Sequence, residues 1–88
     1  MPKTEEKLAE ELCWLLHDWE KDTPLPPKSR VCKTLTSALF SAKSTLPPGT
    51  LRRVFIQDLA ASLNRKRILP NEKYDKFVQT GYEYMEAV

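Results

Sequence analysis

Apolar residues recur at intervals of three and four along four stretches of the chain, separated by short polar links. In the first stretch Leu8, Leu12, Leu15 and Trp19 fall on one side of a helix, and similar spacing recurs over residues 31–42, 51–63 and 74–85. This spacing is typical of amphipathic helices, and no stretch alternates as a half-buried strand does. The pattern predicts helices over about residues 5–21, 30–43, 51–64 and 72–87.

Proline precedes each predicted helix, followed closely by a residue that can cap it. The four marks are Pro2-Lys3-Thr4, Pro26-Pro27-Lys28-Ser29, Pro47-Pro48-Gly49-Thr50 and Pro70-Asn71. Proline fixes φ and has no N–H, which suits the chain just before a helix, while Thr, Ser and Asn accept hydrogen bonds from its first N–H groups. The links are about six residues each, short enough to favour antiparallel neighbours.

The expected fold is therefore all-α: a compact, single-domain four-helix up-and-down bundle with short proline-containing connections. A chain of 88 residues is too short for two independent cores. The side chains expected in the central layer of the core are Leu12, Leu15, Leu35, Leu39, Phe55, Leu59 and Val78.

Three aromatic residues do not fit these core faces. Trp14 and Phe40 point away from the apolar stripes of the first and second predicted helices, and Tyr84 widens the apolar arc of the fourth. Large aromatic side chains are enriched at protein interfaces, where they bury much area at small entropic cost. We predict that these three residues mark a partner-binding surface; cover by bundle curvature or a loop is the alternative.

Composition excludes several classes of protein. Hydrophobic content is 41% and charged content 30%, which is too apolar for a disordered chain. No apolar run approaches the roughly 18 residues of a membrane span, and no secretory leader is expected. Two cysteines, Cys13 and Cys32, do not make a disulfide framework, so we expect reduced thiols in a cytoplasmic or nuclear protein, with a Cys13–Cys32 bridge as the alternative.

Charge is unevenly distributed along the chain, although the net charge is only +2. Residues 1–22 carry three lysines against seven acids, residues 23–67 carry nine basic residues against Asp58 alone, and residues 68–88 carry two lysines against four acids. The middle of the chain is therefore basic, and both ends are acidic.

Basic residues also occur where a helix dipole disfavours them. Arg30 and Lys33 fall in the first turn of the second predicted helix, and Arg52 and Arg53 in that of the third, although negative charge is favoured at helix starts. In an up-and-down bundle the start of the second helix meets the end of the third. The predicted anion- or partner-binding cluster is therefore Lys28, Arg30, Lys33, Arg65, Lys66 and Arg67, with Arg52 and Arg53 as secondary basic residues. In the alternative interpretation, the acidic helices pair with this charge internally.

Residues for catalysis or metal binding are sparse. The only glycines are Gly49 and Gly81, so no phosphate-binding loop is present. Cys13, His17 and Cys32 are three possible metal ligands, but they lack paired-cysteine spacing. We therefore expect no metal, no cofactor, no small-molecule substrate and no enzymatic activity.

The sequence favours a small non-enzymatic adaptor or regulator that binds another protein, or itself, through its exposed aromatics and its basic end. No membrane partner is expected. The alternative is a nucleic-acid-binding module that contacts phosphates through the basic end. A helix-turn-helix version of that alternative would use Arg52, Arg53, Gln57 and Asn64 of the third helix, although the expected link before it is longer than the usual turn.

Overall fold

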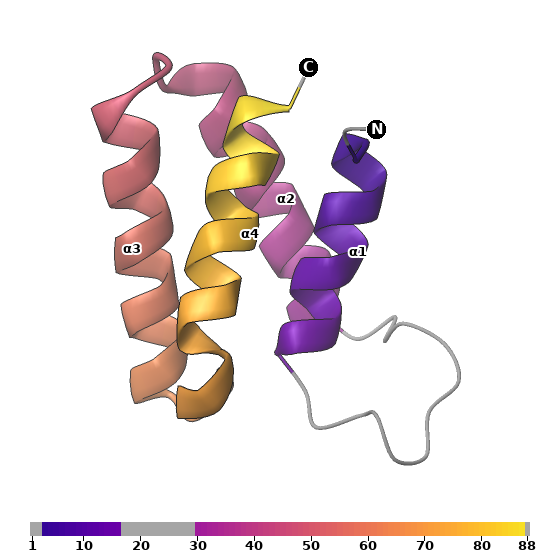
Figure 1. Cartoon of the computed structure of the whole chain (residues 1–88), viewed down its shortest axis with the longest axis vertical. Helices are drawn as coiled ribbons and strands as arrows, with labels where there is room; N and C mark the ends of the chain where they lie inside the picture. Colours follow the sequence, from indigo (N-terminus) through magenta and orange to yellow (C-terminus); the bar gives the residue numbers. More distant parts are fainter. Residues whose placement is uncertain (1–2, 17–29, 88) are drawn as a thin grey trace.

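The computed structural model describes residues 3–16 and 30–87, which form four α-helices. These are α1 (Glu5–Leu15), α2 (Arg30–Thr45), α3 (Thr50–Arg65) and α4 (Tyr74–Glu86), the last preceded by the 3-10 turn η1 (Asn71–Lys73). Successive helices run in opposite directions, so the predicted all-α up-and-down bundle is confirmed (Figure 1). The helix predicted over residues 5–21 ends at Leu15, and residues 17–21 lie outside the described part of the chain.

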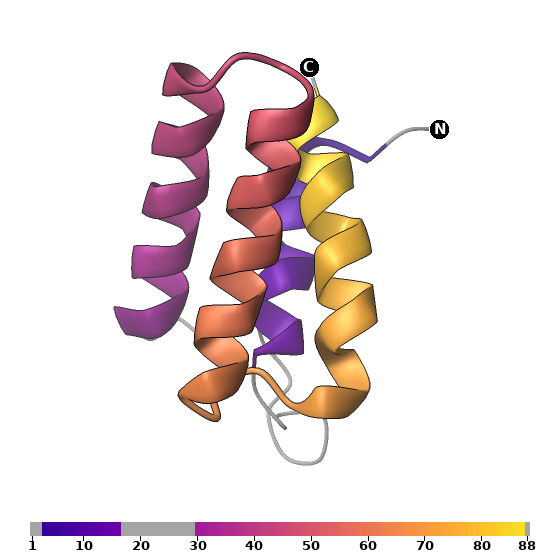
Figure 2. The same cartoon turned by 90° about the vertical axis from the view of Figure 1, so that its left-hand side faces the viewer.

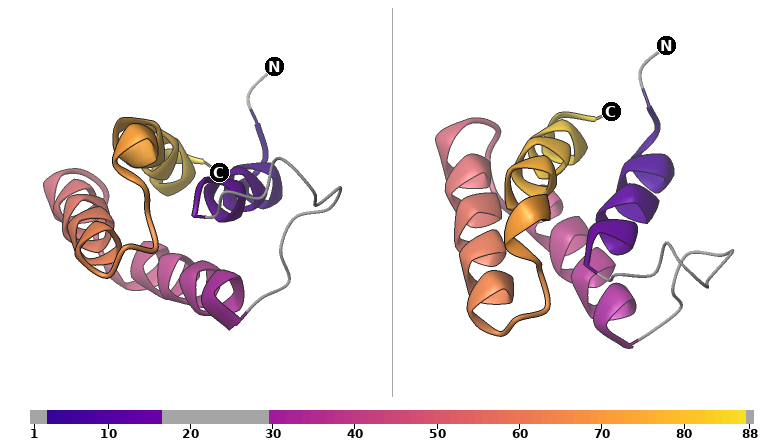
Figure 3. Two further views of the ribbon diagram at one scale, coloured as in Figure 1. Left: turned by 90° about the horizontal axis from the view of Figure 1, so that it is seen from below. Right: turned by 60° about the horizontal axis from the view of Figure 1, so that its bottom comes forward.

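Three helices form an arc and the fourth closes it. Seen along the bundle, α4 lies between α1 and α3, and α2 lies across their open side (Figure 3). A quarter turn from Figure 1, α2 and α3 lie next to each other in front of α1 (Figure 2). The packing of α4 against both α1 and α3 is closer than that of α2 against either neighbour.

The helix starts follow the predicted capping only in part. Thr4 caps α1, because its Oγ1 accepts a hydrogen bond from the Lys7 N–H at 3.2 Å. The caps predicted at Thr50 and Asn71 are wrong: both residues lie inside their helices, and the N-cap positions are Gly49 and Pro70. Gly49 has a φ of 109°, a conformation that glycine adopts without steric cost and that turns the chain into α3. The predicted cap Ser29 lies outside the described residues.

The core is centred on α4, and this changes which face of α3 is buried. Leu12, Leu35 and Leu39 are buried as predicted. The other four residues predicted for the central layer are only partly buried, namely Leu15, Phe55, Leu59 and Val78. Fully buried Ile56 and Phe77 occupy the centre instead.

The close approach of α3 to α4 explains this difference. A Cβ on Gly81 of α4 would lie 2.8 Å from Cγ2 of Ile56, so only glycine lets the two helices pack at this spacing. The Ile56 and Ala60 face of α3 is consequently turned inward. The stripe that begins at Leu51 is left toward the outside, where Leu51 is 54% exposed.

Candidate functional site: the basic end and its groove

The start of α2 and the end of α3 lie at the same end of the bundle, as the up-and-down topology requires (Figure 1). We call five of the cationic residues there the basic end: Arg30, Lys33, Arg65, Lys66 and Arg67. All five are exposed. Arg30 and Lys66 line one common hollow, so the structure brings together one cation from the start of α2 and one from the end of α3. The remaining predicted member, Lys28, lies outside the described residues.

The chain at the end of α3 makes a tight reversal that displays three cations in succession. The Arg67 N–H donates to the Asn64 carbonyl at 3.0 Å, and the Ile68 N–H donates to the Leu63 carbonyl at 2.9 Å. This is the Schellman arrangement, whose central residue is usually glycine because it needs a left-handed backbone. Arg67 occupies that position with a φ of 61°, at a cost of roughly 1–2 kcal/mol. An arginine is therefore held where local conformation favours glycine.

Asn64 fixes the link that follows. Its Nδ2 donates to the Leu69 carbonyl at 3.0 Å and to Oδ1 of Asn71 at 2.7 Å. One side chain thus ties the last turn of α3 to the beginning of η1. The backbone that carries Arg65, Lys66 and Arg67 is therefore held by hydrogen bonds at the end of α3 and at the start of η1.

Three ion pairs of the described residues lie away from the five cations of the basic end. Lys43 of α2 pairs with Glu5 at 2.6 Å, and Arg53 of α3 pairs with Glu86 at 3.3 Å, both at the opposite end of the bundle. A third pair joins Lys3 and Glu11 at 2.7 Å. Within residues 3–16 and 30–87, no carboxylate forms an ion pair with any of the five cations of the basic end. Internal ion pairs therefore account for Lys43 and Arg53 at the far end but for none of these five cations.

Arg52 has a structural role that the sequence did not reveal. Its guanidinium donates to the carbonyls of Leu46, Lys43 and Met85 at 3.0, 2.8 and 2.7 Å. Because α3 starts where α2 and α4 end, this arginine neutralises the carbonyl ends of two neighbouring helices. The secondary basic residues Arg52 and Arg53 therefore belong to the far end, and Arg53 also lies over the Tyr82 ring, 4.9 Å from its centroid.

In the structure, the side chains that would donate hydrogen bonds to DNA in the helix-turn-helix alternative already have partners within the molecule. The link between α2 and α3 is residues 46–49, shorter than expected, so length no longer opposes this alternative. However, Gln57 donates to the Tyr82 hydroxyl at 2.5 Å, and Asn64, Arg52 and Arg53 have the partners given above. All four side chains expected to contact DNA are thus engaged within the molecule.

The three predicted interface aromatics differ in exposure. Phe40 is 62% exposed on α2, and Trp14 is partly exposed on α1. Tyr84 is only 3% exposed, so its assignment to a binding surface is wrong. It belongs to the face of α4 enclosed by the other helices, with the Lys43 ammonium 5.2 Å from its ring centroid. Burial, and secondarily the charge of Glu5, raises the pKa of the Tyr84 hydroxyl above its ordinary value.

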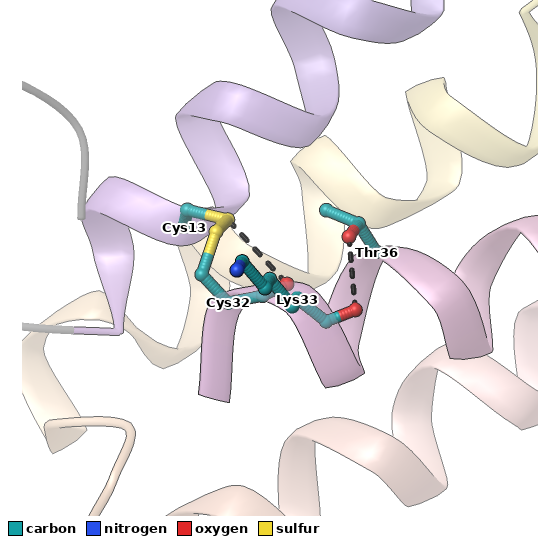
Figure 4. Close-up of a disulfide and its surroundings, with 4 residues drawn as sticks. All are labelled: Cys13, Cys32, Lys33 and Thr36. Carbon is teal, nitrogen blue, oxygen red and sulfur yellow. Dashed lines mark hydrogen bonds between the residues drawn. A yellow bond between two sulfur atoms is a disulfide. The ribbon is translucent and has the colours of Figure 1, made fainter. Parts of the chain in front are cut away.

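A disulfide joins the helices beside the basic end. Cys13 near the end of α1 is bonded to Cys32 in the first turn of α2, with their Cα atoms 5.4 Å apart (Figure 4). The expectation of reduced thiols is therefore wrong, because the bundle places the end of α1 against the start of α2. Neither sulfur is free to bind a metal or act as a nucleophile, and His17 lies outside the described residues. In the same turn, the Thr36 hydroxyl donates to the Lys33 carbonyl at 3.1 Å (Figure 4).

An apolar hollow of about 280 Å³ adjoins the basic end between α2 and α3. Its lining includes Ala38 of α2, Leu59 and Leu63 of α3, and Ile68 of the following link, all partly buried. We call this hollow the α2–α3 groove. Leu59 was expected in the core, and it contacts both the core and the groove.

No family model, no curated protein and no solved structure matches this chain. Among the described residues, every helix falls short of the length and apolar content that a membrane crossing needs.

Proposed function

We propose that this protein is a non-enzymatic helical adaptor or regulator that binds an acidic segment of another protein at its basic end. One observation carries the proposal: five exposed cations gather at one end with no carboxylate pairing with them among the described residues. The left-handed Arg67 supports it, because residues kept against local backbone preference often serve a function. Arg52 is excluded from this binding role by its three carbonyl partners.

Nucleic acid is the second candidate, favoured by the same cations. Phosphate binding alone gives no reason for an apolar groove beside them, and the polar donors of α3 are already engaged. Self-association through Phe40 is a further possibility within the protein-binding class, because this large side chain is 62% exposed. Sedimentation of the wild type and of a Phe40→Ser variant would detect it.

The test compares two double charge reversals that change the net charge equally. Arg65→Glu/Arg67→Glu alters the basic end, and Lys3→Glu/Lys7→Glu alters two exposed lysines at the start of α1, at the opposite end of the bundle. Each purified protein captures partners from nuclease-treated extract of its native source. We expect proteins retained by the wild type to be lost at least tenfold with the first variant and kept with the second.

Three results would contradict the proposal. Equal losses with both variants would mean that only net charge matters. Retention of all captured proteins by the first variant would make the basic end irrelevant to binding. Capture from untreated extract that is absent from nuclease-treated extract, together with steeply salt-dependent binding to duplex DNA or to RNA, would favour the nucleic-acid alternative.

The location remains a prediction for experiment. A cytoplasmic or nuclear site was expected from reduced thiols, and the disulfide removes that support because such bonds are rare in those compartments. Trapping free thiols by alkylation in intact cells of the native source tests it. A cytoplasmic protein should be alkylated at Cys13 and Cys32 without added reductant.

A further inference from the structure

We infer that the α2–α3 groove docks one amphipathic helix of a partner protein, with carboxylates of that helix set against Arg30 and Lys66. This inference rests on the proposed function, because it names the kind of acidic segment that the basic end would bind. The groove supplies the apolar contact, and the two cations supply its orientation.

The groove offers an apolar floor between two helices. Leu35 at its base is buried, while Ala38, Leu59, Leu63 and Ile68 present part of their surface. A volume of about 280 Å³ is smaller than the roughly 300–1,000 Å³ of most small-molecule sites. It suits a few side chains projecting from a larger ligand, as in recognition of a helix by its i, i+3 and i+4 anchors.

The apolar surface continues from the groove along α3. Leu51, Phe55 and Leu59 are four residues apart and share one side of the helix. Leu51 is 54% exposed and Val54, beside it, is 43% exposed, whereas Phe55 and Leu59 are partly buried against the core, so this side is open at Leu51 and only half-covered nearer the groove. From Leu51 to Lys66 the stripe spans about 22 Å, which equals about four turns of a bound helix.

The two cations at the groove define the charge of the occupant. Arg30 and Lys66 contribute from opposite sides of the groove, one from the start of α2 and one just after α3. Both are exposed, and neither forms an ion pair with a carboxylate of the described residues. An occupant with carboxylates at this end would be complementary in charge, and an occupant with cations there would be repelled.

A second copy of this chain does not offer such a helix within its described part. The acidic helix α1 already buries Leu8 and Leu12 in its own core. The exposed positions of α4 are polar or charged: Asp75, Lys76, Gln79, Glu83 and Glu86. The complementary combination of acidic and exposed apolar side chains must therefore come from a different protein.

The experiment selects ligands and then compares two serine substitutions. A phage-displayed library of helical peptides of about 16 residues is panned against the intact, disulfide-bonded protein. We expect enrichment of peptides with apolar residues at helical spacing and at least two carboxylates near one end. Titration of the best peptide should shift the methyl NMR signals of Leu59 and Leu63.

Ser62→Glu places a carboxylate in the groove, four residues before Lys66, whereas Ser37→Glu makes the same change on α2 outside it. The first should weaken peptide binding at least tenfold and the second less than twofold. Ser62 is only partly buried, so the Ser62→Glu side chain can reach water and the variant should stay folded. Arg30→Glu/Lys66→Glu is the second variant and should also weaken binding at least tenfold.

The outcomes separate this inference from the proposed function. If panning selects no acidic amphipathic peptide, the inference that the groove docks a helix is overturned. Equal peptide binding by the Ser62→Glu and Ser37→Glu variants would overturn it as well. If the groove variants bind normally while Arg65→Glu/Arg67→Glu loses its captured proteins, the proposed function stands and the groove does not. A wild-type dimer that Ser62→Glu dissociates would identify the occupant as a second copy and would also overturn the inference.

Discussion

Arg52 stabilises the ends of two helices, α2 and α4, through one side chain. Its guanidinium reaches carbonyls in the last turns of α2 and α4 and in the link after α2, while its backbone lies in the first turn of α3. Without this side chain, three carbonyls in a partly buried region lose a charged donor. Hydrogen bonds to charged groups contribute about 1.5–3 kcal/mol each and are not additive.

We expect Arg52→Ala to lower the free energy of unfolding by at least about 2 kcal/mol, measured by urea denaturation. Arg52→Lys is the matched control, since it keeps the charge but not the planar fork that reaches several acceptors at once. It should recover only part of the loss. A change below about 0.5 kcal/mol in Arg52→Ala, within the range of ordinary surface substitutions, would contradict this role.

Arg67 allows a different test, because its left-handed backbone lowers the stability of the fold while its charge is expected to promote partner binding. Arg67→Gly should raise the free energy of unfolding by about 1 kcal/mol, since glycine adopts the left-handed backbone without steric cost. Arg65→Gly removes the same charge from within α3 and should lower it by about 1 kcal/mol. Both variants should weaken partner binding. Thermal unfolding distinguishes them, and a loss of stability in Arg67→Gly would contradict the conformational argument.

At the scale of the helices, the spacing of α3 and α4 is set at Gly81. A methyl group there would come within 2.8 Å of Ile56 Cγ2 and 3.0 Å of Ile56 Cδ1. We expect Gly81→Ala to destabilise the protein by about 1–3 kcal/mol through overpacking, although alanine is the better helix former.

The Ile56→Ala background provides the control. That substitution alone should cost about 2–5 kcal/mol by leaving a cavity, and it removes the atoms with which the Gly81→Ala methyl would clash. In this background, Gly81→Ala should become neutral or stabilising. A double-mutant cycle measured by denaturation gives the coupling, and an unchanged cost of Gly81→Ala would show that Ile56 does not set the helix spacing.

The same contact explains how far the sequence predicts the helices and their faces. Helix positions follow from local spacing, so α2 and α3 appear within two residues of their expected ends. The inward face of α3 does not follow, because both the Leu51–Phe55–Leu59 stripe and the Ile56–Ala60 side are apolar. Tertiary contact with Gly81 chooses between them. The spacing of apolar residues alone therefore does not show that Leu59 lines a groove as well as contacting the core.

The site was predictable where topology alone decides proximity. Antiparallel neighbours bring Arg30 of α2 to the end of α3, and the structure places Arg30 and Lys66 at one groove. Arg52 was predicted to be a secondary basic residue of the same site, and its carbonyl partners in α2, in the link after α2 and in α4 become neighbours only when the helices pack. Tyr84 was predicted at a binding surface because the apolar arc of its helix is wider than one core face. Such a wide arc also arises when a helix is enclosed by its neighbours, as α4 is.

For the whole molecule, the two ends of the bundle have different balances of charge. At the far end, Lys43, Arg52 and Arg53 are engaged by carboxylates or carbonyls. At the basic end, the disulfide is the covalent connection that holds the start of α2 against α1. Contacts between α1 and α2 are otherwise sparser than those of α1 with α4. The bridge therefore supports the placement of Arg30 and Lys33 as well as stability.

Reduction of the disulfide should consequently affect both properties. The bridge closes a loop across 19 positions of sequence, for which loop entropy gives a stabilisation of about 3 kcal/mol. We expect reduction to lower the free energy of unfolding by about this amount, measured by urea denaturation with and without reductant. A Cys13→Ala/Cys32→Ala variant should be similarly destabilised and should not respond to reductant.

Reduction should also weaken binding of the selected acidic peptide, measured at a temperature where the reduced protein stays folded, because Arg30 is then less firmly positioned. Unchanged stability on reduction would show that packing, rather than the bridge, holds α2 against α1.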